Sequence, residues 1–170
     1  DPDDARMAIA GLRLAQEVMS SPSIRSYLRR ERMPGGLGFH PYVPLEVGHD
    51  IRFNASAPCA FDRDYLMQAS TRRPTHATAQ RIDLDSTETR EVTRMHALWE
   101  GALRSGSQDR ALHVHAQGAL RHLIVHRPSA APYVCIEPVS HLPDAFNFPA
   151  ADADWMGAVT LDPGQSLSGH

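Results

Sequence analysis

The sequence predicts an all-β protein, built as an antiparallel sandwich or as part of one. Several short segments alternate apolar with polar residues or form brief apolar runs, as strands do. The 170 residues include 13 prolines and 11 glycines, and many of them fall between these segments. Strands joined by such turns usually form sheets that pack face to face and bury one side of each strand.

The N-terminal part departs from this pattern. Residues 3–20 are rich in Ala, Arg, Leu, Met, Gln and Glu, and propensity alone predicts a helix there. Residues 33–46 carry closely spaced prolines and glycines, which exclude a helix and predict an ordered loop or an edge strand. Residues 51–90 are polar with little periodicity, and we interpret them as long connections.

The strand signal is strongest in the C-terminal third. Residues 111–128 predict two strands joined by a turn at Gln117-Gly118. Residues 132–139 form a short apolar strand that ends near a proline. Residues 157–170 predict two short strands around a turn at 162–165. No repeat divides the chain, so we treat 1–170 as a single domain.

Composition excludes several classes of function. The net charge is −3, which gives no basic surplus for nucleic acid. No apolar stretch is long enough to span a membrane. All 17 basic residues are arginines, so lysine Schiff-base chemistry and a P-loop are excluded. With no signal peptide visible, we expect a cytoplasmic protein. Cys59 and Cys135 lie far apart and are interpreted as reduced thiols.

His40 and Glu137 are the candidate catalytic residues. His40 lies in GLGFHPY, where glycines and a proline constrain the backbone. It is either a functional side chain on a rigid loop or a turn histidine bonded to backbone. Glu137 interrupts the apolar run YVCIEPV. It either faces solvent at a strand end or is partly buried beside a site, where burial would raise its pKa and suit a general base.

The ten histidines raise the alternative of a metal-binding β domain. His113 and His115 would share one face of a strand, and so could His122 and His126. No carboxylate stands at a supporting spacing, and no HExxH motif occurs. We therefore interpret these histidines as solvent-facing strand positions and expect no metal site.

Three blocks of sequence carry a resemblance to a known family. GLGFHPYVP, PYVCIEPVSHLPDAFNFP and the closing LDPGQSLSGH resemble the C-terminal half of the aldose 1-epimerase (galactose mutarotase) family over residues 33–170. The resemblance implies a galactose mutarotase-like supersandwich that lacks its N-terminal half. It also favours strands over the helix that propensity predicts near the N-terminus.

The resemblance implies an isomerase of carbohydrate metabolism that interconverts the α and β anomers of a hexose. The ring opens when an acid protonates the ring oxygen while a base removes the proton of the anomeric hydroxyl, with the two groups on opposite sides of the sugar. Matched by motif, His40 is the acid and Glu137 the base. The substrate is a monosaccharide, and neither a metal nor an organic cofactor is expected.

The sequence also departs from the family pattern. Met95 stands where the family has a sugar-binding aspartate, while His96 is expected to line the cleft as a substrate-binding residue. These departures and the missing half leave a non-catalytic carbohydrate-binding relative, or an inactive fragment, as the alternative. Sheet surface exposed by the missing half would favour an oligomer. Arg72 and Arg73 are either phosphate ligands for a phosphorylated hexose or a solvated loop pair.

Overall fold

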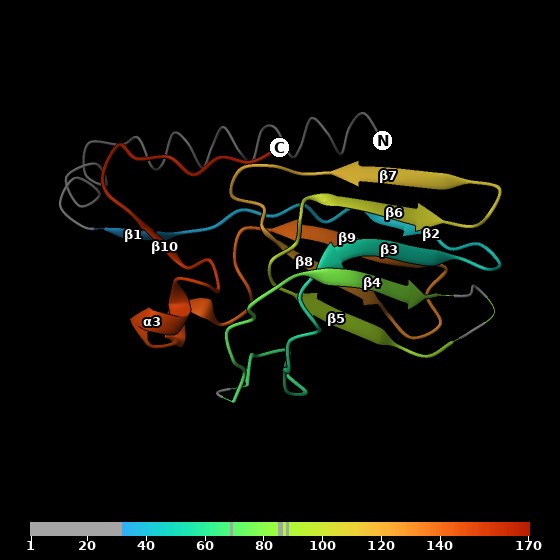
Figure 1. The fold of residues 1–170 in the computed structure, drawn as a ribbon, viewed down its shortest axis with the longest axis horizontal. Helices are drawn as coiled ribbons and strands as arrows, with labels where there is room; N and C mark the ends of the chain where they lie inside the picture. Colours follow the sequence, from blue (N-terminus) through green and yellow to red (C-terminus); the bar gives the residue numbers. More distant parts are fainter. Residues whose placement is uncertain (1–31, 69, 85–86, 88) are drawn as a thin grey trace, which may run out of the picture. The chain divides into compact units, whose positions relative to one another are not determined.

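The computed structural model describes residues 32–68, 70–84, 87 and 89–170, and within them the regular structure is nearly all sheet (Figure 1). The exceptions there are the single turn η1 (Ala145–Asn147) and the four-residue helix α3 (Ala150–Ala153). The all-β prediction is therefore confirmed. The helix predicted over 3–20 lies outside the described residues. In the described part of the chain, no helix has the length and apolar character needed to cross a membrane.

The chain divides into two units, which are described separately. The first includes, of the described residues, Arg32, Met33 and 160–166. Its features include a two-bond ion pair in which Arg32 donates to both carboxylate oxygens of Asp162, at 2.7 and 3.3 Å. The short strands β1 (Met33–Gly35) and β10 (Val159–Leu161) each have residues in both units.

The second unit, residues 34–159 and 167–170, holds two four-stranded antiparallel sheets (Figure 1). The first sheet has the order β2 (Tyr42–Pro44), β9 (Tyr133–Val139), β8 (His122–Arg127), β5 (Val92–His96). The second has the order β4 (Thr78–Asp83), β3 (Asp50–Ala55), β6 (Ala102–Gly106), β7 (Ala111–His115).

The inner faces of the two sheets share one hydrophobic core. Its buried side chains come from both sheets and from the connections between them: Val43, Ile51, Phe53, Ala55, Leu84, Val92, Trp99, Leu103, Ala116, Leu120, Leu123, Val125, Val134 and Ile136. Because apolar side chains of both sheets pack in one cluster, the unit is a sandwich.

A second apolar cluster covers part of the outer face of the first sheet. Met95 of β5 and Ile124 of β8 stand opposite each other on this face. Chain segments 59–67 and 142–158 supply the side chains that pack over them, with Trp155 and Met156 among those buried. The rest of the outer face, over β2 and β9, carries the candidate site.

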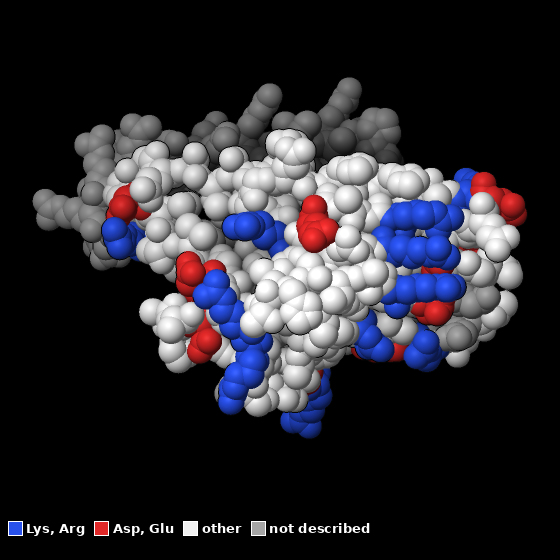
Figure 2. All heavy atoms as spheres, viewed as in Figure 1, with Lys and Arg blue, Asp and Glu red and all other residues white. Residues whose placement is uncertain are grey.

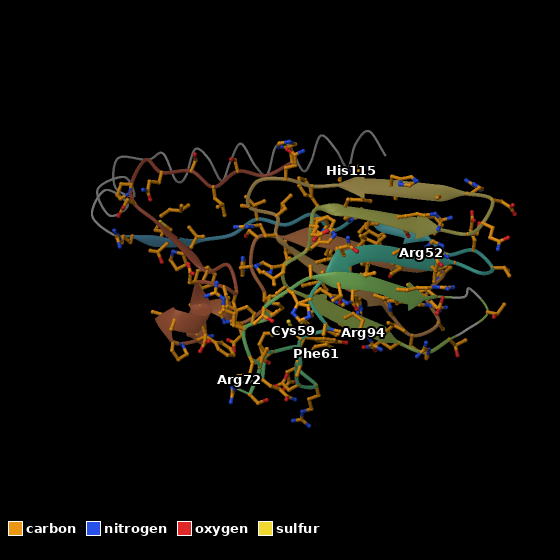
Figure 3. All side chains as sticks on the ribbon, viewed as in Figure 1. Arg52, Cys59, Phe61, Arg72, Arg94 and His115 are labelled. Carbon is orange, nitrogen blue, oxygen red and sulfur yellow. The ribbon has the colours of Figure 1, made fainter. Side chains whose placement is uncertain are left out.

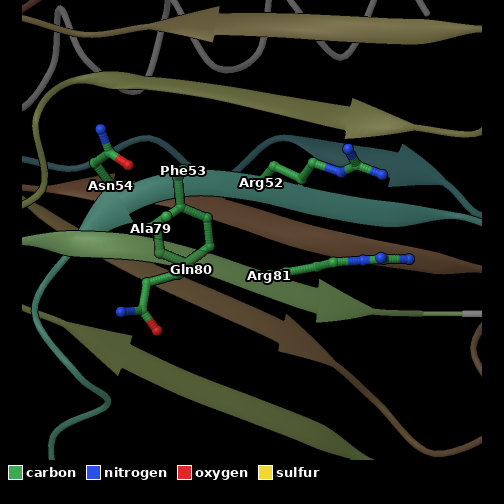
Figure 4. A pocket seen from close by; sticks show the side chains of 6 residues that line it. All are labelled: Arg52, Phe53, Asn54, Ala79, Gln80 and Arg81. Carbon is green, nitrogen blue, oxygen red and sulfur yellow. The ribbon is translucent and has the colours of Figure 1, made fainter.

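The outer face of the second sheet is strongly polar. Arg81, Arg52 and Arg104 stand side by side on β4, β3 and β6. All three contact the buried carboxylate of Asp50 at 2.7–3.1 Å. Figure 2 shows basic side chains gathered on one face of the molecule. Figure 4 shows Arg52 and Arg81 extended side by side at an open depression over β3 and β4.

Several predictions about the elements are wrong in detail. Residues 51–90 contain most of β3 and all of β4, not only connections. From Ile51 onward β3 buries every second side chain. β4 is an edge strand with mostly exposed residues, so its sequence carries little signal. The strands predicted in 111–128 exist as β7 and β8, but they belong to different sheets and do not form a hairpin.

The predictions for residues 33–46 and for the C-terminal third agree more closely with the structure. The edge strand expected within 33–46 is β2, and the strand expected over 132–139 is β9. The turn at 162–165 is present, with Gln165 N–H donating to the Asp162 carbonyl at 2.9 Å. Beyond this turn the described chain pairs through a single bridge, between Gly169 and Gly118, rather than a strand.

Candidate active site

The antiparallel register between β2 and β9 brings His40 and Glu137 together from positions far apart in sequence. The strands pair with Tyr42 opposite Cys135. An isolated bridge continues the same register at Gly38 and Val139. Counting along it from either side places His40 directly opposite Glu137. Both side chains lie on the outer face of the first sheet, because the alternating strand residues on the other face belong to the core.

The two side chains are in direct contact. Nε2 of His40 lies 3.1 Å from Oε1 of Glu137, and the side chains are 52% and 15% exposed. Burial raises the pKa of Glu137, while the charges of His40 and His126 act in the opposite direction. The expected sugar-sized gap between acid and base is not present here, so a sugar must displace this contact to reach both groups.

Cys135 completes a cluster of three different donor groups. It precedes Glu137 by two residues on β9, so both point to the same face of the sheet. The Cys135 sulfur, a ring nitrogen of His40 and a carboxylate oxygen of Glu137 all lie within 4.8 Å of one another. Burial raises the pKa of the Cys135 thiol, and the Glu137 carboxylate raises it further. Both cysteines are free thiols, as predicted.

His126 extends the polar surface onto β8. It stands opposite Cys135 in the β8–β9 pairing. Its Nδ1 lies 2.9 Å from the Thr93 hydroxyl oxygen, which holds the ring in place. The ring of Tyr65 packs edge-on against it at a centroid distance of 6.0 Å. The sequence interpretation did not assign His126 to this site, because only the strand register shows its proximity.

Two tyrosines form an aromatic surface next to His40. The ring centroid of Tyr42 lies 5.0 Å from those of both His40 and Tyr133. Tyr42 is 62% exposed, which is unusual for so large an apolar ring. Sequence reasoning missed this feature, although position i+2 from His40 on an extended segment was a usable signal.

His96, the expected substrate-binding residue, is placed elsewhere. It stands opposite Leu123, whose side chain lies in the sandwich core. The residue is 1% exposed, with its ring 4.9 Å from Phe53 and its Nδ1 2.8 Å from the Ser56 carbonyl oxygen. Burial lowers the pKa of His96. The structure does not bring it to His40 and Glu137, and we leave it out of the proposed site.

Met95 does share the face of the candidate site. It stands opposite Ile124, which in turn stands opposite Glu137. However, Met95 is 2% exposed and belongs to the second apolar cluster, with Cys59 among its members. Figure 3 labels Cys59 and Phe61 on the chain that follows β3. Met95 therefore fills a packing position where the resemblance implies a sugar-binding aspartate.

The other candidate ligands stay apart from this site. His113 and His115 are exposed on β7, in the second sheet, where Figure 3 labels His115. In the described residues they do not belong to a group of three metal-binding side chains. Arg72 and Arg73 are exposed on the connection between β3 and β4, where Arg72 donates to the Ser70 carbonyl. This placement matches the solvated loop pair rather than a built phosphate site.

Comparison with known proteins gives a clear result for the fold. No family model and no curated protein matches the sequence. Solved structures do match, and they define the class: an antiparallel sandwich of the galactose mutarotase-like type. The predicted fold class and the resemblance to the C-terminal part of such proteins are thereby confirmed at the level of the fold.

Three of the matching structures are specific. A galactose mutarotase-like protein from Clostridium acetobutylicum aligns with a TM-score of 0.65 and 14% identity, covering 84% of this chain and 47% of its own. A protein of Escherichia coli K12 provisionally named an aldose 1-epimerase aligns with a TM-score of 0.60 and 21% identity, covering 82% of this chain and 49% of its own. A galactose mutarotase-like protein from Lactobacillus casei aligns with a TM-score of 0.56 and 17% identity, covering 82% of this chain and 52% of its own. The chain thus spans about half the length of these structures.

Proposed function

We propose that the protein interconverts the α and β anomers of a hexose, the reaction of an aldose 1-epimerase. His40 acts as the acid and Glu137 as the base. The observation that carries the proposal is their 3.1 Å contact on the outer face of the first sheet. The mutarotase-like fold supports it, because the matching structures include one protein provisionally named an aldose 1-epimerase and others named galactose mutarotase-like.

The chemistry of the pair suits the reaction. A protonated imidazole can give a proton to the ring oxygen, and an ionised carboxylate can take the proton of the hydroxyl. Proton transfer by such positioned side chains contributes roughly 10²–10⁴-fold to a rate. The partial burial of Glu137 strengthens its charge interactions relative to water.

The reaction balances without any other reactant. The ring oxygen and the anomeric hydroxyl oxygen are both bonded to C1, so two neighbouring side chains can reach both. His40 gives its Nε2 proton to the ring oxygen as the C1–ring oxygen bond breaks, and Glu137 takes the hydroxyl proton. Rotation about C1–C2 and closure then return both protons and produce the other anomer.

Tyr42 provides a surface for the sugar. Its exposed ring adjoins His40, and an aromatic face packs well against the apolar C–H face of a hexose. In this arrangement the sugar lies over Tyr42 and inserts its C1 end between His40 and Glu137. The proposed site therefore combines one aromatic platform with one acid–base pair.

Polarimetry of freshly dissolved α-galactose and α-glucose tests the proposal. The full chain should accelerate mutarotation, and Glu137→Gln or His40→Asn should each lower the rate by about 100-fold or more. His113→Asn and Glu100→Gln are matched controls, because both residues are exposed and associated with the second sheet. If the two site variants keep the full rate while folded, the catalytic assignment is wrong.

A carbohydrate-binding protein without turnover is the second candidate. The observation that favours it is the burial of Met95 at the position where the resemblance implies a sugar-binding aspartate. This candidate predicts that hexose shifts the NMR signals of Tyr42 and His40 while the mutarotation rate stays at that of buffer. Accelerated mutarotation that depends on Glu137 would reject it.

A further inference from the structure

We propose that His40, Cys135 and Glu137 form a binding site for a thiophilic divalent metal ion such as Zn²⁺, and that the bound ion blocks the acid–base pair. The binding part of this inference stands on the cluster itself, while the inhibitory part rests on the proposed function. Among the described residues, this is the group whose nitrogen, sulfur and oxygen donors lie within 4.8 Å of one another.

The backbone holds the three donors in a fixed arrangement. Cys135 and Glu137 project from the same face of β9, and the β2–β9 register places His40 opposite Glu137. Backbone hydrogen bonds fix this register close to the site, with the Phe39 N–H donating to the Pro138 carbonyl at 3.0 Å. Donors on paired strands need little reorganisation when an ion binds.

The distances are close to those of a tetrahedral zinc site. Zinc binds histidine nitrogen and carboxylate oxygen at about 2.0–2.2 Å and thiolate sulfur at about 2.3 Å, so its ligand atoms lie roughly 3–4 Å apart. The His40 nitrogen and the Glu137 oxygen are already 3.1 Å apart. Small side-chain rotations suffice to bring the Cys135 sulfur to the same centre, because all three donors lie within 4.8 Å.

The chemistry of the donors selects the kind of ion. A thiolate, an imidazole and one carboxylate suit Zn²⁺, Cd²⁺ or Co²⁺, whereas Mg²⁺ and Ca²⁺ prefer all-oxygen sites. The two anionic ligands neutralise the charge of a divalent ion, and the Cys135 proton passes to solvent on binding. Three protein ligands leave a fourth position for water.

Exposure provides a path for the ion. Cys135 is 2% exposed and the Glu137 side chain is 15% exposed, but the His40 side chain is 52% exposed. An ion therefore enters from the His40 side and meets the sulfur at the bottom of the cluster. Once bound, it occupies the His40 nitrogen and the Glu137 oxygen that the proposed reaction uses.

Metal binding to the full chain is the first test. After chelator treatment and buffer exchange, isothermal titration should show one Zn²⁺ bound per chain. Co²⁺ should give a thiolate-to-metal charge-transfer band in the near ultraviolet, which reports the Cys135 sulfur directly. Absence of stoichiometric zinc binding, or cobalt binding without this band, would overturn the proposal.

The two cysteines offer a matched pair of variants. Cys135→Ser should weaken zinc binding by at least about 10-fold and abolish the cobalt band. Cys59→Ser, which alters the other buried thiol, should change neither. His40→Asn, at an exposed side chain, provides a second ligand variant should Cys135→Ser fail to fold. Equal effects of Cys59→Ser and Cys135→Ser would contradict the site.

Inhibition is measured separately, so the two proposals fail in different ways. Zinc should slow the mutarotation catalysed by the unmodified chain and by Cys59→Ser, and a chelator should restore it. Zinc binding to a metal-free chain that has no mutarotase activity rejects the proposed function and keeps the metal site. Activity that zinc leaves unchanged at saturation rejects the inhibitory site.

Discussion

Asp50 and Asp83 stand directly opposite each other on β3 and β4, yet they lie in very different environments. The side chain of Asp50 is 6% exposed, while that of Asp83 is 70% exposed. Arg52, Arg81 and Arg104 all contact Asp50. This buried carboxylate allows three guanidinium groups to stand on neighbouring strands, where like charges would otherwise repel.

Asp50→Asn should destabilise the fold more than the matching change at Asp83. The substitution leaves three arginines side by side without their common counter-charge, and the loss of charged hydrogen bonds at this buried position costs roughly 1–3 kcal/mol. Asp83→Asn is the matched control at the exposed position opposite, with an expected effect under about 1 kcal/mol. Urea unfolding measures both, and equal effects would show that burial of Asp50 contributes no stability.

His122 should make stability depend on pH in the acid range. It is 4% exposed, and burial lowers its pKa from 6.5 to about 4, with smaller effects from His141 and Arg121. Between these values the unfolded chain takes up a proton that folded His122 does not. The free energy of unfolding should therefore fall by up to about 3 kcal/mol as pH drops from 6.5 to 4, and the contribution is fully present above pH 6.5.

Substitution at His122 tests this assignment. His122→Gln removes the titrating group, so the free energy of unfolding should fall less between pH 6.5 and 4 than in the unmodified chain. His113→Gln, at an exposed position on β7, should leave the original pH dependence in place. If the free energy of unfolding depends on pH in the same way in both variants, another group causes the acid sensitivity.

Substitutions at Gly157 and Gly48 distinguish the cost of backbone strain from the cost of a steric clash. Both glycines have positive φ, 83° and 69°, which a side chain disfavours. A Cβ at Gly157 would lie 2.1 Å from the Ser140 carbonyl oxygen, but one at Gly48 meets nothing within 4 Å. We expect Gly48→Ala to cost about 1 kcal/mol. Gly157→Ala should cost clearly more, as thermal unfolding would show.

The fold class was predicted correctly because a strongly apolar segment such as β9 can be identified as a strand from its own sequence, without knowledge of its neighbours. It missed β4 because an edge strand with mostly exposed residues carries no apolar alternation. It paired β7 with β8 because local turn chemistry cannot show that the connection crosses from one sheet to the other. These errors concern pairing and burial, which depend on the whole chain.

Part of the candidate site could also be predicted from the sequence. The motifs around His40 and Glu137 singled out both residues, and the β2–β9 register then placed them in contact. His96 was expected to line the site and instead faces the core, because alternation along a strand fixes two faces without showing which one is buried. His126 was interpreted only as a solvent-facing strand position, and the β8–β9 register shows that it lies beside Cys135. Only the sheet packing shows that His96 faces the core.

Met95 offers a direct test of whether its position serves packing or sugar binding. Because it is 2% exposed inside an apolar cluster, Met95→Asp places a carboxylate where nothing polar replaces its hydration. We expect a loss of about 4 kcal/mol or unfolding, and no gain in mutarotation or hexose affinity. Met95→Leu keeps volume and polarity and should cost under about 1.5 kcal/mol. A folded Met95→Asp variant that binds hexose more tightly would instead mean that the covering chain opens to expose this position to the sugar.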